Sequence, residues 1–311
     1  MVRYPRDTAF FMQKNTNIKS VIRAKFKLLL FNIDFRYTIG IDLKTDGGFY
    51  MTNEYKTVLT DEILHFLYRN ASFQALDENE QQQFLEKFGK QPLFIEVIEI
   101  AIALEEMIAE VEATMPKIQD KDYLFPIEQQ KQLLKDRTVI DGNVLYVPFE
   151  EMKNLYSPMI VILQQSDAMQ GVEAFTKGTI LPLFNLCAVQ KRDLIILPFS
   201  NKPAQPLLFK NGTLEIEMFD QFLQHFLTGD AQIMPAIDKA IELFTQDNIG
   251  HQRDLMIITD NQFSDFHKLN QEVAAGKMQE LDIDLAVIAM SETAFEKQPI
   301  SFADKVFFAN D

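Results

Sequence analysis

Short, fully apolar runs alternate with helical patterns in the second half of the chain, and this alternation constrains the fold more than any other feature. The runs are MIVIL, DLIILPF, PLLFK, DLMIITD, DLAVIAM and KVFFAN. The segments between them predict helices over 172–189, 219–226, 234–244 and 264–281. Strands that are apolar along their whole length are typical of a parallel sheet covered by helices on both faces. The sequence therefore predicts a doubly wound, mostly parallel α/β domain over residues 151–311.

Residues 1–150 show a different pattern, which predicts a mainly helical N-terminal domain. One helix is expected over LTDEILHFLYRNA, capped by Thr60 or Asp61, and a second over DENEQQQFLEKFG, ending at Gly89. A long third helix is expected over 92–115. Asp-Gly turns predict two small hairpins, near 37–52 and 138–148.

The long predicted helix carries a ladder of glutamates between its apolar positions. No Glu-x-x-His accompanies them, which a helical carboxylate metal site would need. The ladder therefore indicates a solvated face, and it also argues against a membrane span. Its members are Glu96, Glu99, Glu105, Glu106 and Glu110.

The charge and cysteine content exclude several classes of function. A net charge of −15 argues against general nucleic-acid binding, which needs a basic face. The basic residues of segment 1–30 would contact an anionic surface or pair with the acidic remainder of the chain. The single cysteine, Cys187, is expected to be a buried thiol and excludes a disulfide framework. Without a recognisable secretory signal, we expect a soluble, cytoplasmic protein.

Three polar loops follow apolar runs of the predicted sheet, over 164–171, 228–232 and 260–265. In a doubly wound sheet the ligand crevice lies at the C-terminal ends of the strands. We therefore expect these three loops to meet there and to form the functional site.

Five segments in this order carry a family resemblance: PMIVILQQSDAMQG, KRDLIILPFS, LTGDAQIMPAIDKAI, DLMIITDNQFSD and IDLAVIAMS. Together they resemble the von Willebrand factor A (VWA) domain over roughly residues 155–311, in particular the bacterial CoxE-like group. Members of that group are often found beside MoxR-type AAA+ ATPases. The resemblance implies a VWA/Rossmann-like fold and a protein-binding face at the crevice. It also implies a role as adaptor of such an ATPase.

The family usually holds a divalent cation at this crevice, in a metal-ion-dependent adhesion site (MIDAS), and the resemblance implies a degenerate one here. Gln164 stands at the first Asp of the family's Asp-x-Ser-x-Ser loop, Ser166 matches the first Ser, and Ala168 replaces the second. Ala231 stands at the Thr of the second loop, and Asp260 matches the Asp of the third. Because Mg²⁺ prefers anionic oxygen ligands, we expect no bound metal.

Two alternatives stay open. Asp167 and Asp230 lie one residue from the vacated positions and would act as substitute ligands in a Mg²⁺-dependent, adhesion-type receptor. An enzyme would use Asp260 as a base or nucleophile, but the sequence contains no nucleophile elbow, phosphate loop or dinucleotide-binding fingerprint. Without a metal, Ser166 would cap the following helix and Asp260 would bond loop amides. We expect a non-enzymatic protein-interaction module without a cofactor.

Overall fold

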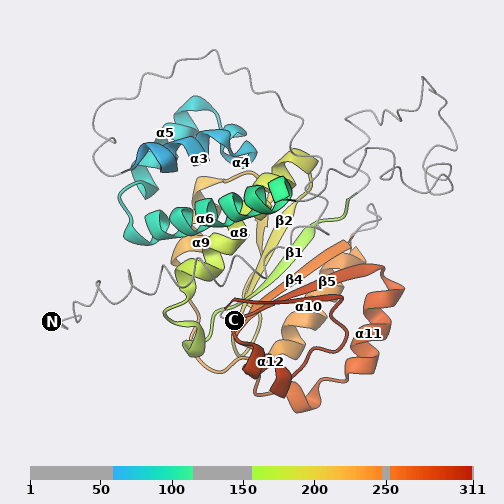
Figure 1. Ribbon diagram of the computed structural model, residues 1–311. Coiled ribbons are helices and arrows are strands. Elements are labelled where there is room, and N and C mark those ends of the chain that lie inside the picture. Colours follow the sequence, from blue (N-terminus) through green and yellow to red (C-terminus); the bar gives the residue numbers. More distant parts are fainter. Residues whose placement is uncertain (1–58, 115–155, 247–252, 310–311) are drawn as a thin grey trace, which may run out of the picture.

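The computed structural model describes residues 59–114, 156–246 and 253–309 (Figure 1). Several predicted features lie outside these residues: the hairpins near 37–52 and 138–148, the basic segment 1–30, and the domain boundary near residue 150.

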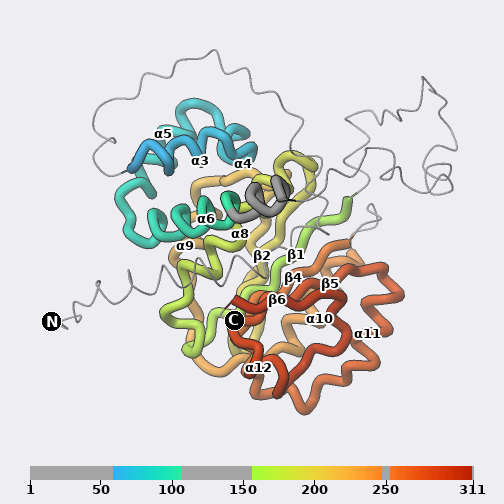
Figure 2. Tube along the Cα trace, in the orientation of Figure 1, coloured from blue at the N-terminus to red at the C-terminus, as the bar shows by residue number. Residues whose placement is uncertain are grey.

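Six strands form one sheet in the order β3-β2-β1-β4-β5-β6 (Figure 1). They are β1 (Met159–Gln164), β2 (Leu194–Phe199), β3 (Leu207–Phe209), β4 (Arg253–Thr259), β5 (Ile283–Ala289) and β6 (Lys305–Phe308). Only the β2–β3 pair is antiparallel among these strands. Figure 2 shows β6 beside β5 at one edge of the sheet. The strand order reverses between β1 and β4, so the predicted doubly wound α/β architecture is confirmed.

Most of the described α-helices lie where the sequence predicts them, but those over 71–74 and 292–297 were not predicted, and the one predicted over 219–226 begins at residue 216. The described α-helices are α3 (Asp61–Arg69), α4 (Ala71–Gln74), α5 (Glu78–Phe88), α6 (Pro92–Thr114), α8 (Glu173–Gln190), α9 (Ile216–Gln224), α10 (Ile233–Gln246), α11 (Gln271–Glu280) and α12 (Glu292–Lys297). Thr60 caps α3 by accepting a hydrogen bond from the backbone N–H of Ile63 at 3.2 Å, and α5 ends before Gly89, as expected.

The predicted start of α11 at residue 264 was wrong. The helix begins at Gln271, where the Asn270 side chain accepts a hydrogen bond from the backbone N–H of Val273 at 3.1 Å. The preceding residues form a loop and a short 3-10 turn (Phe266–Lys268) instead. The cause is a tertiary contact, because Asp265 bonds to the backbone of α10.

Alternate residues of each central strand enter two separate apolar cores. In β1, Met159, Val161 and Leu163 face the core beneath α8. Ile160 and Ile162 face the core beneath α10. Figure 1 shows α6, α8 and α9 on one side of the sheet and α10, α11 and α12 on the other. Burial of both sheet faces explains why the strands are apolar throughout.

The helices before the sheet pack onto α8 and share its core. Gly178 of α8 allows a close approach to α6, because a Cβ there would lie 2.7 Å from Ile100 Cγ2. Phe84 of α5 and Phe94 of α6 pack against Phe219 of α9, with ring centroids 5.1 and 6.2 Å from it. The described helical region therefore shares the core beneath α8 with one face of the sheet.

Two smaller predictions concern this helical layer. Glu96, Glu99 and Glu106 of α6 are exposed, as expected for a solvated face, and Glu105 pairs with Arg69. Cys187 is fully buried, and its burial raises the pKa of the thiol to about 12. The solvated face is confirmed for Glu96, Glu99 and Glu106 but not for Glu105, which is half-buried, and the side chain of Glu110 lies outside the described residues. The buried thiol is confirmed for Cys187. No helix in the described ranges is long and apolar enough to cross a membrane.

Candidate functional site

The three loops predicted to form the site do meet at the C-terminal end of the sheet. We call the surface formed by 164–171, 228–232 and 260–265 the loop face. The Asp167 N–H donates to Gly229 O at 3.4 Å and joins the first loop to the second. The Ser264 N–H donates to Ala231 O at 2.9 Å and joins the third loop to the second. Main-chain hydrogen bonds therefore fix the three loops to one another.

The side-chain amide of Gln164 occupies the centre of the loop face. Its Nε2 donates to Ser166 Oγ at 2.7 Å and to Asp260 Oδ1 at 2.8 Å. Its Oε1 accepts from the hydroxyl of Thr259, which the pairing of Leu163 with Ile258 sets beside it. Because a carboxylate can only accept, Nε2 and not Oε1 must face Asp260. The amide therefore bridges Ser166 and Asp260.

Asp260 has one engaged and one unpaired oxygen. Oδ1 accepts from Gln164 Nε2 and from the backbone N–H of Gln262 at 3.0 Å. The second contact confirms that Asp260 bonds loop amides. Oδ2 is buried and has no hydrogen-bond partner among the residues that the structure describes, and the whole residue is 7% exposed. The loop face therefore keeps a buried carboxylate whose bonding capacity is unfilled.

The expected helix-capping role of Ser166 was wrong. Ser166 stands at the cap position of a short 3-10 turn (Asp167–Met169), but its side chain makes no capping bond. Its hydroxyl oxygen instead accepts a hydrogen bond from Gln164 Nε2. The Ser166 hydroxyl is therefore directed toward Gln164 and not toward the N–H groups of the 3-10 turn.

The two alanines at which the resemblance implies a lost oxygen ligand differ in environment. Ala168 is exposed on the first loop, whereas Ala231 is 3% exposed and packs in the α10 core. The proposed substitutes, Asp167 and Asp230, are both exposed. Within the described ranges, no hydrogen bond or ion pair engages either carboxylate, so nothing draws them toward Asp260.

Residues that the sequence did not single out hold the third loop in place. Asp265 accepts from the N–H groups of Ile233 and Met234, at 2.9 and 3.1 Å, and so caps α10 from a distance in sequence. On the other side, Gln298 Oε1 accepts from the Phe263 N–H at 2.8 Å. An aspartate beside a polar loop was a weak signal for the first contact. No sequence pattern pointed to the second.

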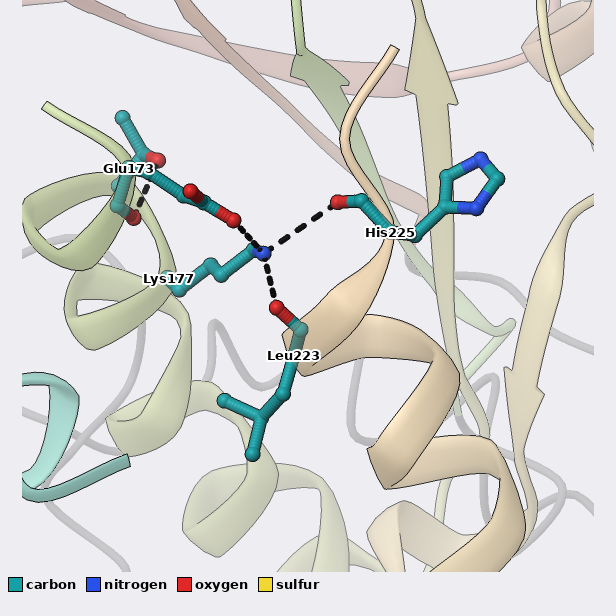
Figure 3. Close-up of polar contacts among 5 residues, drawn as sticks. Glu173, Lys177, Leu223 and His225 are labelled. Carbon is teal, nitrogen blue, oxygen red and sulfur yellow. Dashed lines mark hydrogen bonds and ion pairs between the residues drawn. The ribbon is translucent and has the colours of Figure 1, made fainter. Parts of the chain in front are cut away.

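A buried lysine anchors the end of α9, just before the second loop (Figure 3). Lys177 of α8 has no exposed surface, and its Nζ donates to Leu223 O at 2.5 Å and His225 O at 3.3 Å. It also pairs with Glu173 one turn earlier. Desolvation lowers the pKa of Lys177, and Glu173 partly offsets that effect. The cation therefore satisfies carbonyls at the C-terminal end of α9, where positive charge is favourable.

The donors at the loop face do not fit a MIDAS-type cation. The space between Ser166 Oγ and Asp260 Oδ1 holds an N–H donor, which would repel a cation placed there. Mg²⁺ needs near-octahedral oxygen ligands, and the buried part of the site offers one carboxylate. The described ranges contain no cluster of three or more His, Cys, Asp or Glu side chains suited to a metal.

Comparison with known proteins finds no matching family model and no matching curated protein. Several solved structures are similar. An aerotolerance-related membrane protein from Bacteroides fragilis is 17% identical, with a TM-score of 0.33, over 43% of this chain and 67% of that chain. The SpRpn10 VWA domain is 13% identical, with a TM-score of 0.39, over 50% and 87%. Manganese-loaded TRAP protein from Plasmodium vivax is 15% identical, with a TM-score of 0.35, over 45% and 59%. These likenesses are low in identity and cover about half of this chain, so the description of the fold rests on the strand order itself.

Proposed function

We propose that this chain is a non-enzymatic protein-interaction module that docks a partner through the loop face without a bound metal. The observation that carries the proposal is the Gln164 amide, which bonds Ser166 and Asp260 directly. These bonds hold the first and third loops together without an ion. Loops fixed on a rigid sheet suit recognition, because little conformational freedom is lost on binding.

The finer part of the proposal concerns the partner. The sequence resemblance to the CoxE-like group supports a MoxR-type AAA+ ATPase as partner and an adaptor role for this chain. The helices α3, α5 and α6 would supply a second docking surface, because they form one body with α8 and α9. A location in the cytoplasm would follow from such a partner.

An enzymatic role is not part of the proposal. Asp260 would have to act as base or nucleophile, and such a residue needs an acid, base or metal beside it. Its Oδ1 is engaged by an amide and a backbone N–H, neither of which can play that part. The contacts therefore support a structural and recognition role for this aspartate.

The test is co-purification with a MoxR-type ATPase encoded beside this chain, using two matched variants. Ala168→Arg places a bulky side chain on the loop face, and Val273→Arg places the same side chain on the exposed surface of α11. We expect Ala168→Arg to weaken binding at least about tenfold and Val273→Arg to leave it unchanged. Failure of the wild type to bind the ATPase would refute the named partner. Equal binding by both variants would refute the loop face.

The same assay tests the alternative, a metal-dependent adhesion-type receptor. Asp167 and Asp230 lie on loops that touch through the Asp167 N–H and Gly229 O, and both carboxylates are exposed. If they held Mg²⁺, EDTA would abolish partner binding and Mg²⁺ would restore it. In an assay without nucleotide, where the ATPase's own Mg²⁺–nucleotide site plays no part, the proposed function predicts the same binding with EDTA and with Mg²⁺.

A further inference from the structure

We infer that the loop face receives a cationic side chain, arginine or lysine, from its protein partner. This inference rests on the proposed function and deepens it, because it states the chemistry that the partner must present. The observations that carry it are an unpaired buried carboxylate oxygen and two exposed carboxylates on the surrounding loops.

The unpaired oxygen is Asp260 Oδ2. A carboxylate has about four acceptor sites, and the bonds from Gln164 and Gln262 both go to Oδ1. Burial removes Oδ2 from solvent, so it lacks even the hydrogen bonds that water would give. A buried, unpaired polar atom indicates a missing partner such as a water, an ion or a ligand group. For an anionic oxygen, the strongest such partner is a charged N–H donor.

The surrounding loops add negative charge. Asp167 and Asp230 are exposed, and their loops touch at the Asp167 N–H and Gly229 O. Within the described part of the chain, Asp260 forms no ion pair that would neutralise it. These three carboxylates would attract a basic side chain and repel an acidic one.

One cation of the chain itself opposes this field. Lys202 is exposed on the loop after β2, and its carbonyl accepts from the Ser200 N–H at 3.3 Å. Ser200 O in turn accepts from the Gln232 N–H of the second loop at 2.7 Å. Lys202 therefore lies on a neighbouring loop, where its charge would weaken the attraction without reaching Asp260 in this structure.

Because Asp260 is buried, only a long side chain of the partner could bring a hydrogen-bond donor to it. The residue is 7% exposed, so a partner group must reach below the rim to meet Oδ2. Arginine and lysine carry their charge on long, flexible stems and can do this. An arginine would also have N–H groups left for a rim carboxylate, because its guanidinium presents five donors.

The test uses three short peptides and the full-length chain. Acetyl-Gly-Arg-Gly-amide is the probe, the same peptide with citrulline is its uncharged isostere, and acetyl-Gly-Glu-Gly-amide is the acidic counterpart. Each is titrated to about 10 mM, a range that suits a single side-chain contact, while the amide signals of the protein are followed by NMR. We expect the Arg peptide alone to shift the backbone signal of Gln262 and the side-chain signal of Gln164.

Two variants locate the effect. Asp260→Asn keeps an acceptor for Gln164 and Gln262 but removes the charge, and we expect the Arg peptide to bind it about tenfold more weakly. Asp238→Asn changes an exposed carboxylate of α10 and should bind as the wild type does. Lys202→Gln should bind slightly more tightly. If Asp260→Asn does not fold, the Asp167→Asn, Asp230→Asn double variant should still weaken binding.

Two results would overturn the inference. One is equal response to the Arg and citrulline peptides. The other is no response to any peptide, which would mean that no group of a partner reaches Oδ2. Neither result touches the proposed function, whose test is binding of the ATPase and its loss in Ala168→Arg. If Ala168→Arg weakens partner binding but Asp260→Asn does not, the loop face is confirmed as the docking surface. The inference that it receives a cationic side chain is then refuted.

Discussion

Replacing Gln164 with leucine should destabilise the fold more than any other single change at the loop face. The change keeps a side chain of similar size in a position that is 1% exposed, but it removes all hydrogen-bonding groups. Ser166 and Thr259 each lose one partner, and Asp260 loses its only side-chain donor. All three groups are buried, so water cannot replace the amide.

The magnitude follows from these three bonds. A neutral hydrogen bond contributes about 1 kcal/mol to stability, and one to a charged group about 2 kcal/mol, with more lost where a partner is left buried and unpaired. Gln164 makes two bonds of the first kind and one of the second. We therefore expect Gln164→Leu to lower the free energy of unfolding by about 4 kcal/mol, a large share of the stability of an ordinary domain.

Urea unfolding followed by circular dichroism measures this change. Gln170→Leu is the matched control, because Gln170 is exposed on the same loop, and we expect it to change stability by less than about 0.5 kcal/mol. A loss below about 1 kcal/mol for Gln164→Leu would refute the reasoning. Such a result would mean that the amide does not bridge the loops in solution.

Two further changes test the surroundings of the loop face. Lys177→Met leaves the carbonyls of Leu223 and His225 without their donor, and we expect a loss of about 3 kcal/mol in urea unfolding. Burial holds the pKa of Lys177 below its usual 10.5. Between the lowered pKa and 10.5, the unfolded chain therefore binds more protons than the folded chain. The stability of the wild type should therefore rise relative to Lys177→Met as the pH approaches 10.5; a constant difference would contradict this. Gly178→Ala would place a Cβ 2.7 Å from Ile100 Cγ2 and should lower the free energy of unfolding by about 2 kcal/mol. The change would be seen as a lower melting temperature. Ile100→Ala should not rescue this variant, because Ile100 Cβ and Val97 O would still lie 2.8 and 2.9 Å from the added Cβ. Unchanged stability of Gly178→Ala would argue against the α6–α8 contact.

The fold could be predicted because its physical cause is local and repeated. Each central strand is buried on both faces, so its whole length is apolar and stands out against the amphipathic helices. The cap of α3 at Thr60 could be predicted for the same reason, since the bond joins residues only three apart. The short helix α12 has six residues, too few for a periodic pattern, and it was not predicted.

The centre of the loop face could be predicted only in part. The strand-end rule placed Gln164, Ser166 and Asp260 at one edge of the sheet, and the structure brings them together. The bond between Gln164 and Asp260 joins residues 96 apart, and no sequence pattern specifies such a pair. The family resemblance implied the loss of a carboxylate at position 164, but no sequence pattern indicated that the amide there would bond both Ser166 and Asp260.

The error at α11 has a similar cause. The stretch SDFHKLNQEV has enough helical character to suggest an early start. Asp265, however, bonds the first N–H groups of α10, 31 and 32 residues away. A long-range cap outweighed the local preference, and that contact is also what fixes the third loop against the second.

The most direct test of the account is calorimetric titration of the wild-type chain with Mg²⁺ and Mn²⁺, together with the Gln164→Asp, Ala168→Ser variant. We predict no binding heat and no thermal stabilisation of the wild type at metal concentrations up to about 10 mM. The variant restores one carboxylate and one hydroxyl and should bind at least one of the two ions. Metal binding by the wild type with a dissociation constant below about 1 mM would contradict the claim that the Gln164 amide stands in the place of a cation.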